Sequence, residues 1–430
     1  MRILLINPPI YDFAAFNLWA RPIGILKIIS ILKKLKIDFE FFDFLDISIL
    51  TIDEKKKFKI KIKSNGTYNY PKVEVEKPSI FPKINRKFSR YGLPKEKFLN
   101  FLEKDSKFDF AIITSVMTYW YLGIIEVIEF LRKINPEIKI IVGGIYVNLC
   151  KEHALNRLKA DYIVSSIPEV FKILNIDIKK FNFFPLPLEL YKENPFAPLY
   201  TSFGCPFNCA YCANKFLNPP YTSRDHDKII DELIFYKNLG IKRIAFYDEA
   251  LLINKKTHFI PLMNKIISKG LDFEFYNPNG IHIREIDEEV AELMKKANFK
   301  DIRLSLETAN KELQKKIGYK ANNSQFINAV NLLKKVGFSK EINVYLLVGL
   351  PHQKFNDVKM SIEFAKNFNV KLRLAEFSPI PHTILWQEAI KTAKYDIVNE
   401  PLFHNNTLLP VADKSINFET LNELKIFARA

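Results

Sequence analysis

Residues 201–215 read TSFGCPFNCAYCANK, so that Cys205, Cys209 and Cys212 fall within eight positions of one another. Thiolates are the ligands that bind iron–sulfur clusters, and a tight loop containing glycine and proline can turn three of them toward one cube. A zinc site normally has two paired Cys or Cys/His groups, but the nearest histidine, His226, lies beyond an intervening loop. Three cysteines beside glycine and proline also do not fit a buried apolar face. We therefore expect a 4Fe-4S cluster on this cysteine triplet, with zinc as the alternative.

The cysteine triplet follows the first strand of a regular alternation of strands and helices. Apolar runs alternate with amphipathic helical patterns. Such units predict a parallel sheet that curls toward a partial (β/α)6 barrel, in which the chemistry takes place in the loops after the carboxyl ends of the strands. The expected strands are 199–202, 243–248, 273–277, 301–306, 342–348 and 372–377, and the expected helices are 228–239, 257–269, 288–297, 325–336 and 357–368.

The N-terminal part of the chain shows a second, similar alternation. Its apolar runs and helical patterns predict a doubly wound parallel sheet of the α/β class. A Lys-rich stretch with several prolines, residues 53–107, interrupts the alternation, and we interpret it as a solvated insertion, with RNA binding as the alternative. The expected strands are 3–7, 39–44, 110–114, 139–142 and 161–164, and the expected helices are 24–35 and 122–134.

Length and composition indicate more than one domain. The chain has 430 residues, whereas a single hydrophobic core stops growing near ~250–300 residues. A segment rich in Pro and Phe, residues 181–198, has no periodicity and is the expected linker. We predict an α/β domain over residues 1–180, a barrel over residues 195–385 and a C-terminal extension over residues 386–430.

The composition is that of a globular protein, since 48% of the residues are hydrophobic and 26% are charged. No apolar run reaches the ~18–20 residues that span a bilayer, and residues 1–9 are too short and strand-like for a signal peptide. Four cysteines in a chain of this size do not form a disulfide framework, which favours a reducing, cytoplasmic location. The net charge of +16 could attract nucleic acid, but lysine is spread throughout the chain, so we do not expect a nucleic-acid partner.

A CxxxCxxC triplet with an aromatic residue, Tyr211, just before the last cysteine resembles the radical S-adenosylmethionine (SAM) superfamily. Three ligands leave one iron of a four-iron cube open, which is a catalytic rather than a structural feature. The resemblance implies that SAM chelates this iron and that an electron from the reduced cluster breaks its carbon–sulfur bond. The 5'-deoxyadenosyl radical would then remove a hydrogen atom from the substrate. The resemblance also implies an electron donor such as flavodoxin or ferredoxin, and a protein that positions SAM and excludes water.

Polar residues at the ends of the later strands match those that this superfamily uses to hold SAM. Residues after the second strand would contact the methionine amino group, a polar pair after the fourth would meet the ribose, and a turn after the fifth would lie beside the adenine. Each residue alone could instead cap a helix or form an ordinary turn, and the second strand lacks the Gly-Gly-Glu often found there. The candidates are Tyr211, Tyr247, Asp248, Glu249, Asn277, Asn279, Ser305, Glu307, Gly349 and Pro351.

The N-terminal part contains PP at residues 8–9, PIG at residues 22–24, GG at residues 143–144 after a strand, and YIVSSIPE ending at Glu169. With these motifs it resembles the Rossmann-like cobalamin-binding domain that precedes the radical module in one subgroup. Small residues at the carboxyl ends of parallel strands would let a flat ligand approach the backbone. The loop after the first strand contains Asp12 but no histidine, so cobalt would lack a protein imidazole, and Tyr11, Phe13 or Trp19 could only shield that face. An empty domain would show the same loop. The candidate cobalamin residues are Pro9, Gly24, Ser115, Gly143, Gly144 and Glu169.

Three functions remain open. The first is a cobalamin-dependent radical enzyme, in a subgroup whose commonest chemistry is methyl transfer to an unactivated carbon. The second is a radical SAM enzyme without cobalamin that performs rearrangement, ring formation or oxidation, and the third is a basic metal-binding protein that recognises nucleic acid without catalysis. Methylthiotransferases are disfavoured because their N-terminal domains carry a cysteine triplet, whereas this one has only Cys150, which we interpret as a small buried residue. His282 and His382 are candidates for contact with a small-molecule or peptide substrate.

Overall fold

The computed structural model describes residues 1–429 except 83, 105–106 and 179–182. Small parts of the expected insertion, residues 83 and 105–106, and the first two residues of the expected linker therefore lie outside the described residues. Within the described part of the chain, no helix is long and apolar enough to cross a membrane.

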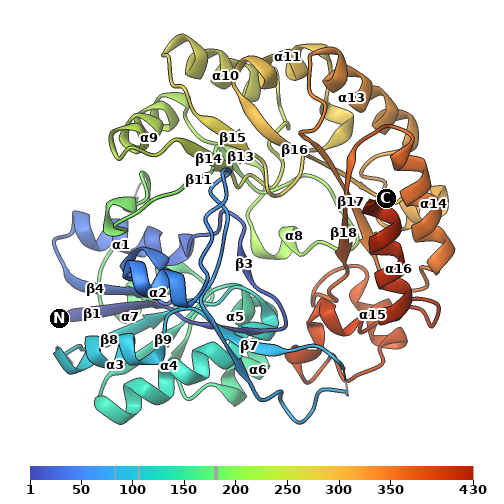
Figure 1. Cartoon of the computed structure of the whole chain (residues 1–430). Coiled ribbons are helices and arrows are strands. Elements are labelled where there is room, and N and C mark those ends of the chain that lie inside the picture. Colours follow the sequence, from blue (N-terminus) through green and yellow to red (C-terminus); the bar gives the residue numbers. More distant parts are fainter. Residues whose placement is uncertain (83, 105–106, 179–182, 430) are drawn as a thin grey trace. The chain divides into compact units, whose positions relative to one another are not determined.

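The chain forms two compact units, which Figure 1 shows coloured along the sequence. The first unit comprises residues 1–195 and 399–403, and the second comprises residues 196–398 and 404–430. The part of the chain that we expected as a separate C-terminal extension is therefore divided between the two units.

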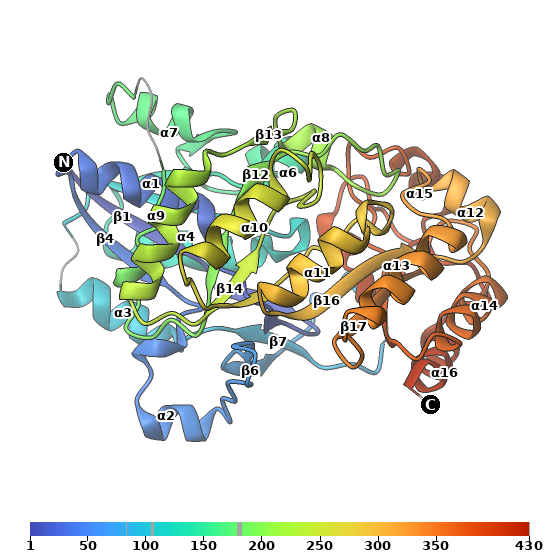
Figure 2. The same ribbon diagram turned by 90° about the horizontal axis from the view of Figure 1, so that it is seen from above.

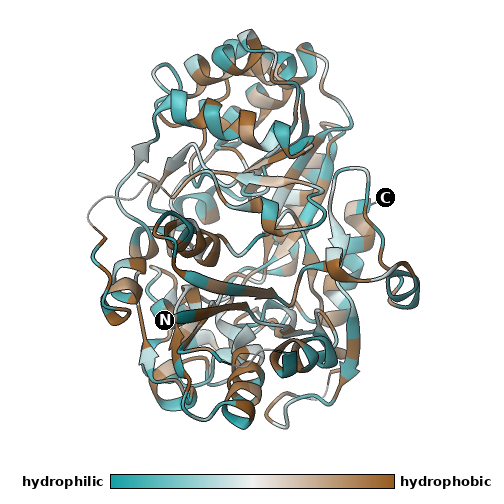
Figure 3. Ribbon diagram, turned by 90° about the vertical axis from the view of Figure 1, so that its left-hand side faces the viewer, coloured by the Kyte–Doolittle hydropathy of each residue, from teal (hydrophilic) through white to brown (hydrophobic). Residues whose placement is uncertain are grey.

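A five-stranded parallel sheet forms the core of the first unit. Its strands are, in spatial order, β10 (Tyr162–Ile163), β9 (Lys139–Val142), β8 (Phe110–Ile113), β1 (Arg2–Asn7) and β4 (Asp38–Asp43). Successive residues of a strand point to opposite faces, and Ile3 to Ile6 of β1 are all completely buried, so both faces of the sheet are covered. This confirms the predicted doubly wound sheet. Figure 3 shows the hydropathy of each residue along the ribbon, with hydrophobic residues in brown. The helices of this unit include α1 (Ile23–Lys34), α4 (Tyr121–Ile134), α5 (Ile145–Leu149), α6 (Lys151–Arg157) and α7 (Ile167–Ile173).

The Lys-rich insertion is packed onto the first unit, so the prediction of a solvated insertion is wrong for much of it. β7 (Phe88–Tyr91) is buried along its whole length because it pairs antiparallel with both β2 (Ile10–Asp12) and β6 (Lys72–Val75). Arg90 is accommodated in this strand because its guanidinium forms an ion pair with Glu126 at 2.6 Å. The pattern of FSRY does not alternate, and only its tertiary partners make it a buried strand.

Two helices within the same stretch differ in their surroundings. α2 (Ile52–Lys57) contains no buried residue and begins with a capping box formed by Thr51 and Glu54, so this part is solvated as expected. α3 (Lys95–Lys104) buries Phe98 and is the helix that leads to β8. It therefore belongs to the doubly wound sheet rather than to an insertion.

A six-stranded parallel sheet forms the core of the second unit and confirms the predicted barrel-like alternation. Its strands are, in spatial order, β11 (Ala197–Leu199), β14 (Arg243–Phe246), β15 (Glu274–Tyr276), β16 (Phe299–Glu307), β17 (Ile342–Val348) and β18 (Lys371–Glu376). The helices that follow the strands lie along one side of the sheet in Figure 2. They are α9 (His226–Asn238), α10 (Phe259–Ser268), α11 (Glu288–Lys296), α13 (Asn323–Lys335) and α14 (Phe355–Lys366).

The first barrel strand is placed earlier than predicted. β11 ends at Leu199, because Ser202–Phe203 (β12) pairs antiparallel with Thr222–Ser223 (β13) instead of continuing the parallel sheet. The residues between β12 and β13 contain the cysteine triplet. At the other end of the unit, α16 (Phe418–Arg429) packs against β18 and α14.

Candidate functional site

The cysteine loop lies between β12 and β13, beyond the carboxyl end of the first barrel strand. Gly204 enters the loop with φ = +75°, and a Cβ there would lie 2.2 Å from the Pro219 carbonyl oxygen, so only glycine fits. The Ala210 N–H donates to the Ile317 carbonyl at 3.0 Å, and the Ala210 carbonyl accepts from the Leu385 N–H at 2.9 Å. Two separate segments of the second unit, at Ile317 and Leu385, therefore hold the loop in shape.

The three thiols of the triplet are near enough to interact electrostatically. Cys205 and Cys209 are half-buried and Cys212 is exposed. Burial raises the pKa of Cys205 and of Cys209, and a neighbouring thiolate of the triplet raises each of them further. Among the described residues, no three Cys, His, Asp or Glu side chains converge closely enough to hold one metal ion. Each thiolate of a four-iron cube binds a different iron, so this donor set fits a 4Fe-4S cluster.

Tyr211 connects the cysteine loop to the end of β16. Its hydroxyl donates to Oε1 of Glu307 at 2.8 Å, and the same oxygen lies 3.5 Å from Nζ of Lys320. Glu307 is buried and has φ = +66°, a left-handed conformation that costs a non-glycine residue about 1 kcal/mol or more. The sequence indicated Tyr211 and Glu307 but not Lys320, because one more lysine in a Lys-rich chain carries no local signal.

Two carboxylates after β14 fasten the start of the cysteine loop. Asp248 is buried and accepts hydrogen bonds from the hydroxyls of Thr201 and Ser202, both at 2.6 Å. Burial raises the pKa of Asp248, and these hydrogen bonds oppose the rise. Glu249 accepts the Gly204 N–H through Oε2 at 3.1 Å. Both side chains thus support the loop, and their contact with the amino group of SAM stays a prediction.

Asp248 also ends a hydrogen-bonded chain that the sequence did not predict. Nε2 of His258 lies 2.9 Å from the Thr201 hydroxyl, and Nε2 of His226 lies 3.1 Å from Nδ1 of His258. Because the Thr201 hydroxyl donates to Asp248, it accepts from His258, which must carry its proton on Nε2. Burial lowers the pKa of His258 to about 4, so the ring is neutral at neutral pH.

Polar side chains gather at the carboxyl ends of β15 and β16. Asn277 is buried, and its Nδ2 donates to the Arg303 carbonyl at 3.2 Å, while its Oδ1 has no partner among the described residues. Ser305 is buried against Gly280, where a Cβ would lie 2.4 Å from its Oγ. Asn279 is exposed and donates to a backbone carbonyl after β14 at 2.8 Å. Asn277 therefore offers one buried acceptor that a ligand could use.

The turn after β17 has the predicted form. Gly349 has φ = +85°, and its N–H donates to Oε1 of Gln353 at 2.8 Å. Gln353 is completely buried, and Pro351 between them is buried as well. The turn is therefore held in place by a side chain of its own segment.

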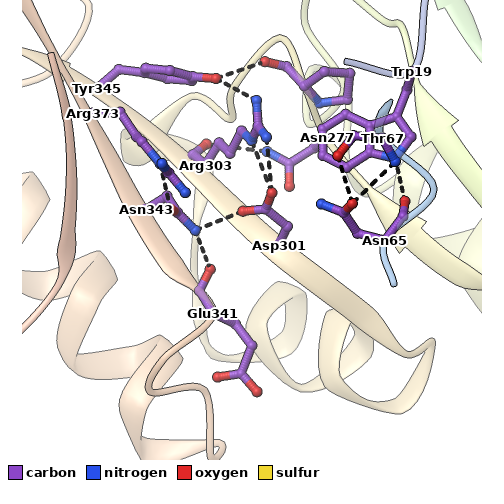
Figure 4. A network of polar contacts seen from close by, with 11 residues as sticks. Trp19, Asn65, Thr67, Asn277, Asp301, Arg303, Glu341, Asn343, Tyr345 and Arg373 are labelled. Atoms are coloured by element: carbon purple, nitrogen blue, oxygen red, sulfur yellow. Dashed lines mark hydrogen bonds and ion pairs between the residues drawn. The ribbon is translucent and has the colours of Figure 1, made fainter. Parts of the chain in front are cut away.

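A polar network covers one face of β16, β17 and β18, as Figure 4 shows. Arg303 lies between Asp301, at 3.0 Å, and the Tyr345 hydroxyl, at 2.6 Å. Asn343 donates to Asp301 at 2.7 Å and accepts from Nε of Arg373 at 3.0 Å. Residues two apart on a strand share a face, so these side chains line the same surface. Asp301 neutralises the charge of Arg303, which makes this network a lining rather than an open anion site.

Two cavities lie at the carboxyl ends of the strands in the first unit. The larger measures about 140 Å³ and is lined by Gly24, Gly143 and Gly144 together with Ile and Val side chains. The smaller measures about 30 Å³ and is lined by residues that include Pro9 and Ser115. The structure thus brings together five of the six predicted cobalamin residues in two groups.

Gly143 and Gly144 allow close contacts between loops of the protein itself. Gly144 has φ = +108°, and a Cβ there would lie 2.3 Å from the Ser115 carbonyl oxygen. A Cβ at Gly143 would lie 3.1 Å from Val164. Both glycines let the loops after β8, β9 and β10 approach one another, and the larger cavity forms beside them. Glu169, the sixth predicted residue, is exposed and accepts a backbone N–H just before α7, so it caps this helix.

Side chains of the loop after β1 are engaged within the first unit. The Tyr11 hydroxyl donates to Glu126, and the Phe13 ring packs against two rings of the insertion. Trp19 is completely buried, and its Nε1 donates to the Asn65 carbonyl at 2.8 Å (Figure 4). The prediction that these side chains shield one face of a bound ligand stays a prediction.

The remaining candidate residues have varied surroundings. His282 is buried with its ring 4.2 Å from that of Phe207, and its Nδ1 has no partner among the described residues. The ring of His382 stacks on that of Phe216 at 3.9 Å. Burial raises the pKa of the Cys150 thiol to about 12, which fits the expected inert, packed cysteine.

Comparison with known sequences finds similarity over the barrel. Residues 199–365 match the radical SAM superfamily. Over 212 residues the chain is 31% identical to an uncharacterised methyltransferase of Pyrococcus horikoshii, and this match covers 48% of the chain and 45% of that protein. The match therefore spans less than half the length of this relative.

Comparison with solved structures covers both units. The radical SAM methyltransferase TsrM from Kitasatospora setae, solved with cobalamin and a [4Fe-4S] cluster bound, is 13% identical with a TM-score of 0.67, over 99% of this chain and 90% of that one. The cobalamin-dependent SAM radical enzyme OxsB, solved with aqua-cobalamin and SAM bound, is 14% identical with a TM-score of 0.55, over 100% of this chain and 56% of that one. These matches show a shared fold, in which a Rossmann-like part precedes the barrel.

Proposed function

We propose that this chain, whose residues 199–365 form a radical SAM domain, is a radical SAM enzyme that uses cobalamin to transfer a methyl group to an unactivated carbon. The observation that carries the proposal is the cysteine triplet on a loop held in shape beyond the carboxyl end of a barrel strand. Its three thiols fit a 4Fe-4S cluster with one iron left for SAM. Catalytic metal sites keep such an open position.

The side chains around the triplet would hold and orient SAM. When bound, the cluster and SAM together supply the carbon radical that removes a hydrogen atom from the substrate. The hydroxyl of Ser305 and the acceptor Oδ1 of Asn277 suit the ribose hydroxyls, and the turn at Gly349 suits the edge of the adenine. The proposed SAM residues are Tyr211, Asp248, Glu249, Asn277, Asn279, Ser305, Glu307, Gly349 and Pro351.

The first unit would bind cobalamin at the carboxyl edge of its sheet. The cavity of about 140 Å³ is lined mostly by Gly, Ile and Val residues, with Thr114, Asn148, Ser165 and Ser166 as its polar residues. This mixed lining suits the benzimidazole of the cobalamin tail, a flat ring with a polar edge. TsrM and OxsB, whose fold this chain shares, were solved with cobalamin, which supports the proposal. The proposed cobalamin residues are Pro9, Gly24, Ser115, Gly143 and Gly144, with Glu169 at the start of α7.

The proposed reaction requires partners that the chain does not contain. A one-electron donor of low potential, such as flavodoxin or ferredoxin, would reduce the cluster. The substrate would be a small molecule or a peptide. Because the thiols of the triplet must stay reduced to bind iron, we place the protein in the cytoplasm.

An ultraviolet–visible spectrum of anaerobically purified protein, recorded with and without added cobalamin, tests the proposal. We expect the broad brown absorbance of a cluster, iron at about four atoms per chain, and the bands of bound cobalamin. The control is Cys150→Ala, which should keep the iron that Cys209→Ala loses. A cluster without cobalamin binding would indicate a radical SAM enzyme of the cobalamin-independent kind. An iron-replete Cys209→Ala variant would contradict the cluster site.

A further inference from the structure

A glycine packs a distant segment against the cysteine loop. Gly318 has φ = +102°, and a Cβ there would lie 3.0 Å from Cα of Cys209 and 2.7 Å from the preceding carbonyl oxygen. The Ile317 carbonyl accepts the Ala210 N–H at 3.0 Å. The backbone on both sides of Cys209 therefore touches the backbone that leads to Lys320.

Lys320 brings a positive charge beside the triplet. Its side chain is 13% exposed, and Nζ lies 3.5 Å from the oxygen of Glu307 that also accepts the Tyr211 hydroxyl. Tyr211 directly precedes Cys212, so this ion pair is attached to the loop. Gly318 and Ile317 contact the backbone at Cys209 and Ala210, so Lys320 follows two residues after this contact.

Because the proposed cluster is charged, the cation of Lys320 affects its reduction potential. A 4Fe-4S cluster on three thiolates is an anion, and reduction adds a further negative charge. The reduction potential of such a cluster depends on the net charge around it and on its exposure to solvent. A cation in a largely buried position is screened less than one in water. It therefore stabilises the reduced cluster more than the oxidised one.

We propose that Lys320 raises the reduction potential of the 4Fe-4S cluster and so brings it within reach of a one-electron donor of low potential. The inference rests on the proposed function, because it requires the cluster. The step is one electron passing from the donor to the cluster, with no bond formed or broken. If Lys320 only stabilised the fold through its ion pair, its removal would leave the reduction potential of the cluster unchanged. The reduction potential therefore distinguishes a role in tuning the cluster from a role in stability alone.

A redox titration of the full-length chain tests this role. The anaerobically reconstituted protein, without SAM, is titrated with dithionite in the presence of mediators, and the reduced cluster is counted by its paramagnetic resonance signal. At the wild-type midpoint, the ratio of reduced to oxidised cluster should fall about tenfold in Lys320→Met, a shift of about 59 mV to lower potential for a one-electron couple. Lys320→Arg should stay near the wild type. The matched control is Lys316→Met, which removes an exposed lysine paired with Glu388 and should not shift the midpoint.

Removing the partner carboxylate tests the opposite sign. Glu307→Gln should raise the potential, by less than Lys320→Met lowers it, and the double variant should lie between the two. If Lys320→Met loses iron, the potentials of Glu307→Gln and Lys320→Arg are measured instead. A reduction potential in Glu307→Gln that is unchanged or lowered overturns the inference. An unchanged midpoint in iron-replete Lys320→Met overturns the role of Lys320 and leaves the cluster in place. A wild-type chain that binds no cluster overturns the proposed function itself.

Discussion

The Thr201 hydroxyl links a neutral buried histidine to a buried carboxylate, and Thr201→Val removes this link with little change in shape. Asp248 then loses a hydrogen bond to a charged acceptor, worth about 1.5–3 kcal/mol, and His258 keeps a buried N–H without an acceptor, which costs about 1–3 kcal/mol. The Ser202 hydroxyl and a backbone N–H still donate to Asp248. We therefore expect a loss of about 3 kcal/mol of local stability in the second unit.

Hydrogen exchange followed by mass spectrometry measures this loss, because peptides from α9 and β14 report the opening of this part of the unit. A decrease of about 3 kcal/mol corresponds to exchange that is faster by about two orders of magnitude when opening limits the rate. Thr201→Ser is the matched control, since it keeps the hydroxyl and loses one methyl group. Exchange in Thr201→Val that is no faster than in Thr201→Ser would refute the reasoning.

Four further outcomes are expected. Replacing any cysteine of the triplet by Ala should abolish cluster iron in metal analysis, whereas Cys150→Ala should not. Gly204→Ala should lower the iron content and reduce stability by at least about 2 kcal/mol, because its Cβ would meet the Pro219 carbonyl at 2.2 Å; iron counting and thermal unfolding check this. The pKa of His258 falls from 6.5 to about 4 on folding, so the free energy of unfolding should be highest above pH 6.5 and should decrease by about 3 kcal/mol as the pH falls toward 4. His258→Gln should remove this pH dependence, which unfolding measured at several pH values checks. One-electron-reduced cobalamin bound to the protein should show no nitrogen superhyperfine splitting from an axial base, since residues 8–23 contain no histidine; a nitrogen triplet would contradict this.

The elements whose pattern is local could be predicted from the sequence. β17 and β9 have the predicted bounds, and each barrel helix was expected within a few residues, because amphipathic periodicity depends on neighbours along the chain. β7 was not predicted, since its burial depends on antiparallel partners on either side that are distant in sequence. The end of β11 was also not predicted, because it depends on the antiparallel pairing of β12 with β13.

The residues of the candidate site likewise fall into those that the local sequence predicts and those that only tertiary contacts reveal. The spacing of the triplet is visible in the sequence, and so are the glycines and carboxylates that end strands. Lys320 and His258 were missed because their roles arise from contacts with the cysteine loop and with Thr201, which only the tertiary structure creates. Asp248 was predicted as a ligand contact, but its donors, Thr201 and Ser202, come from another strand end.

Residues 399–403 return to the first unit after the whole barrel has been completed. Glu400 in this segment accepts the Tyr121 hydroxyl at 2.9 Å, and Leu402 is buried. During synthesis, a ribosome must therefore release nearly the entire polypeptide before the first unit can acquire its last segment. A fragment that stops near residue 195 would therefore lack a segment of the first unit.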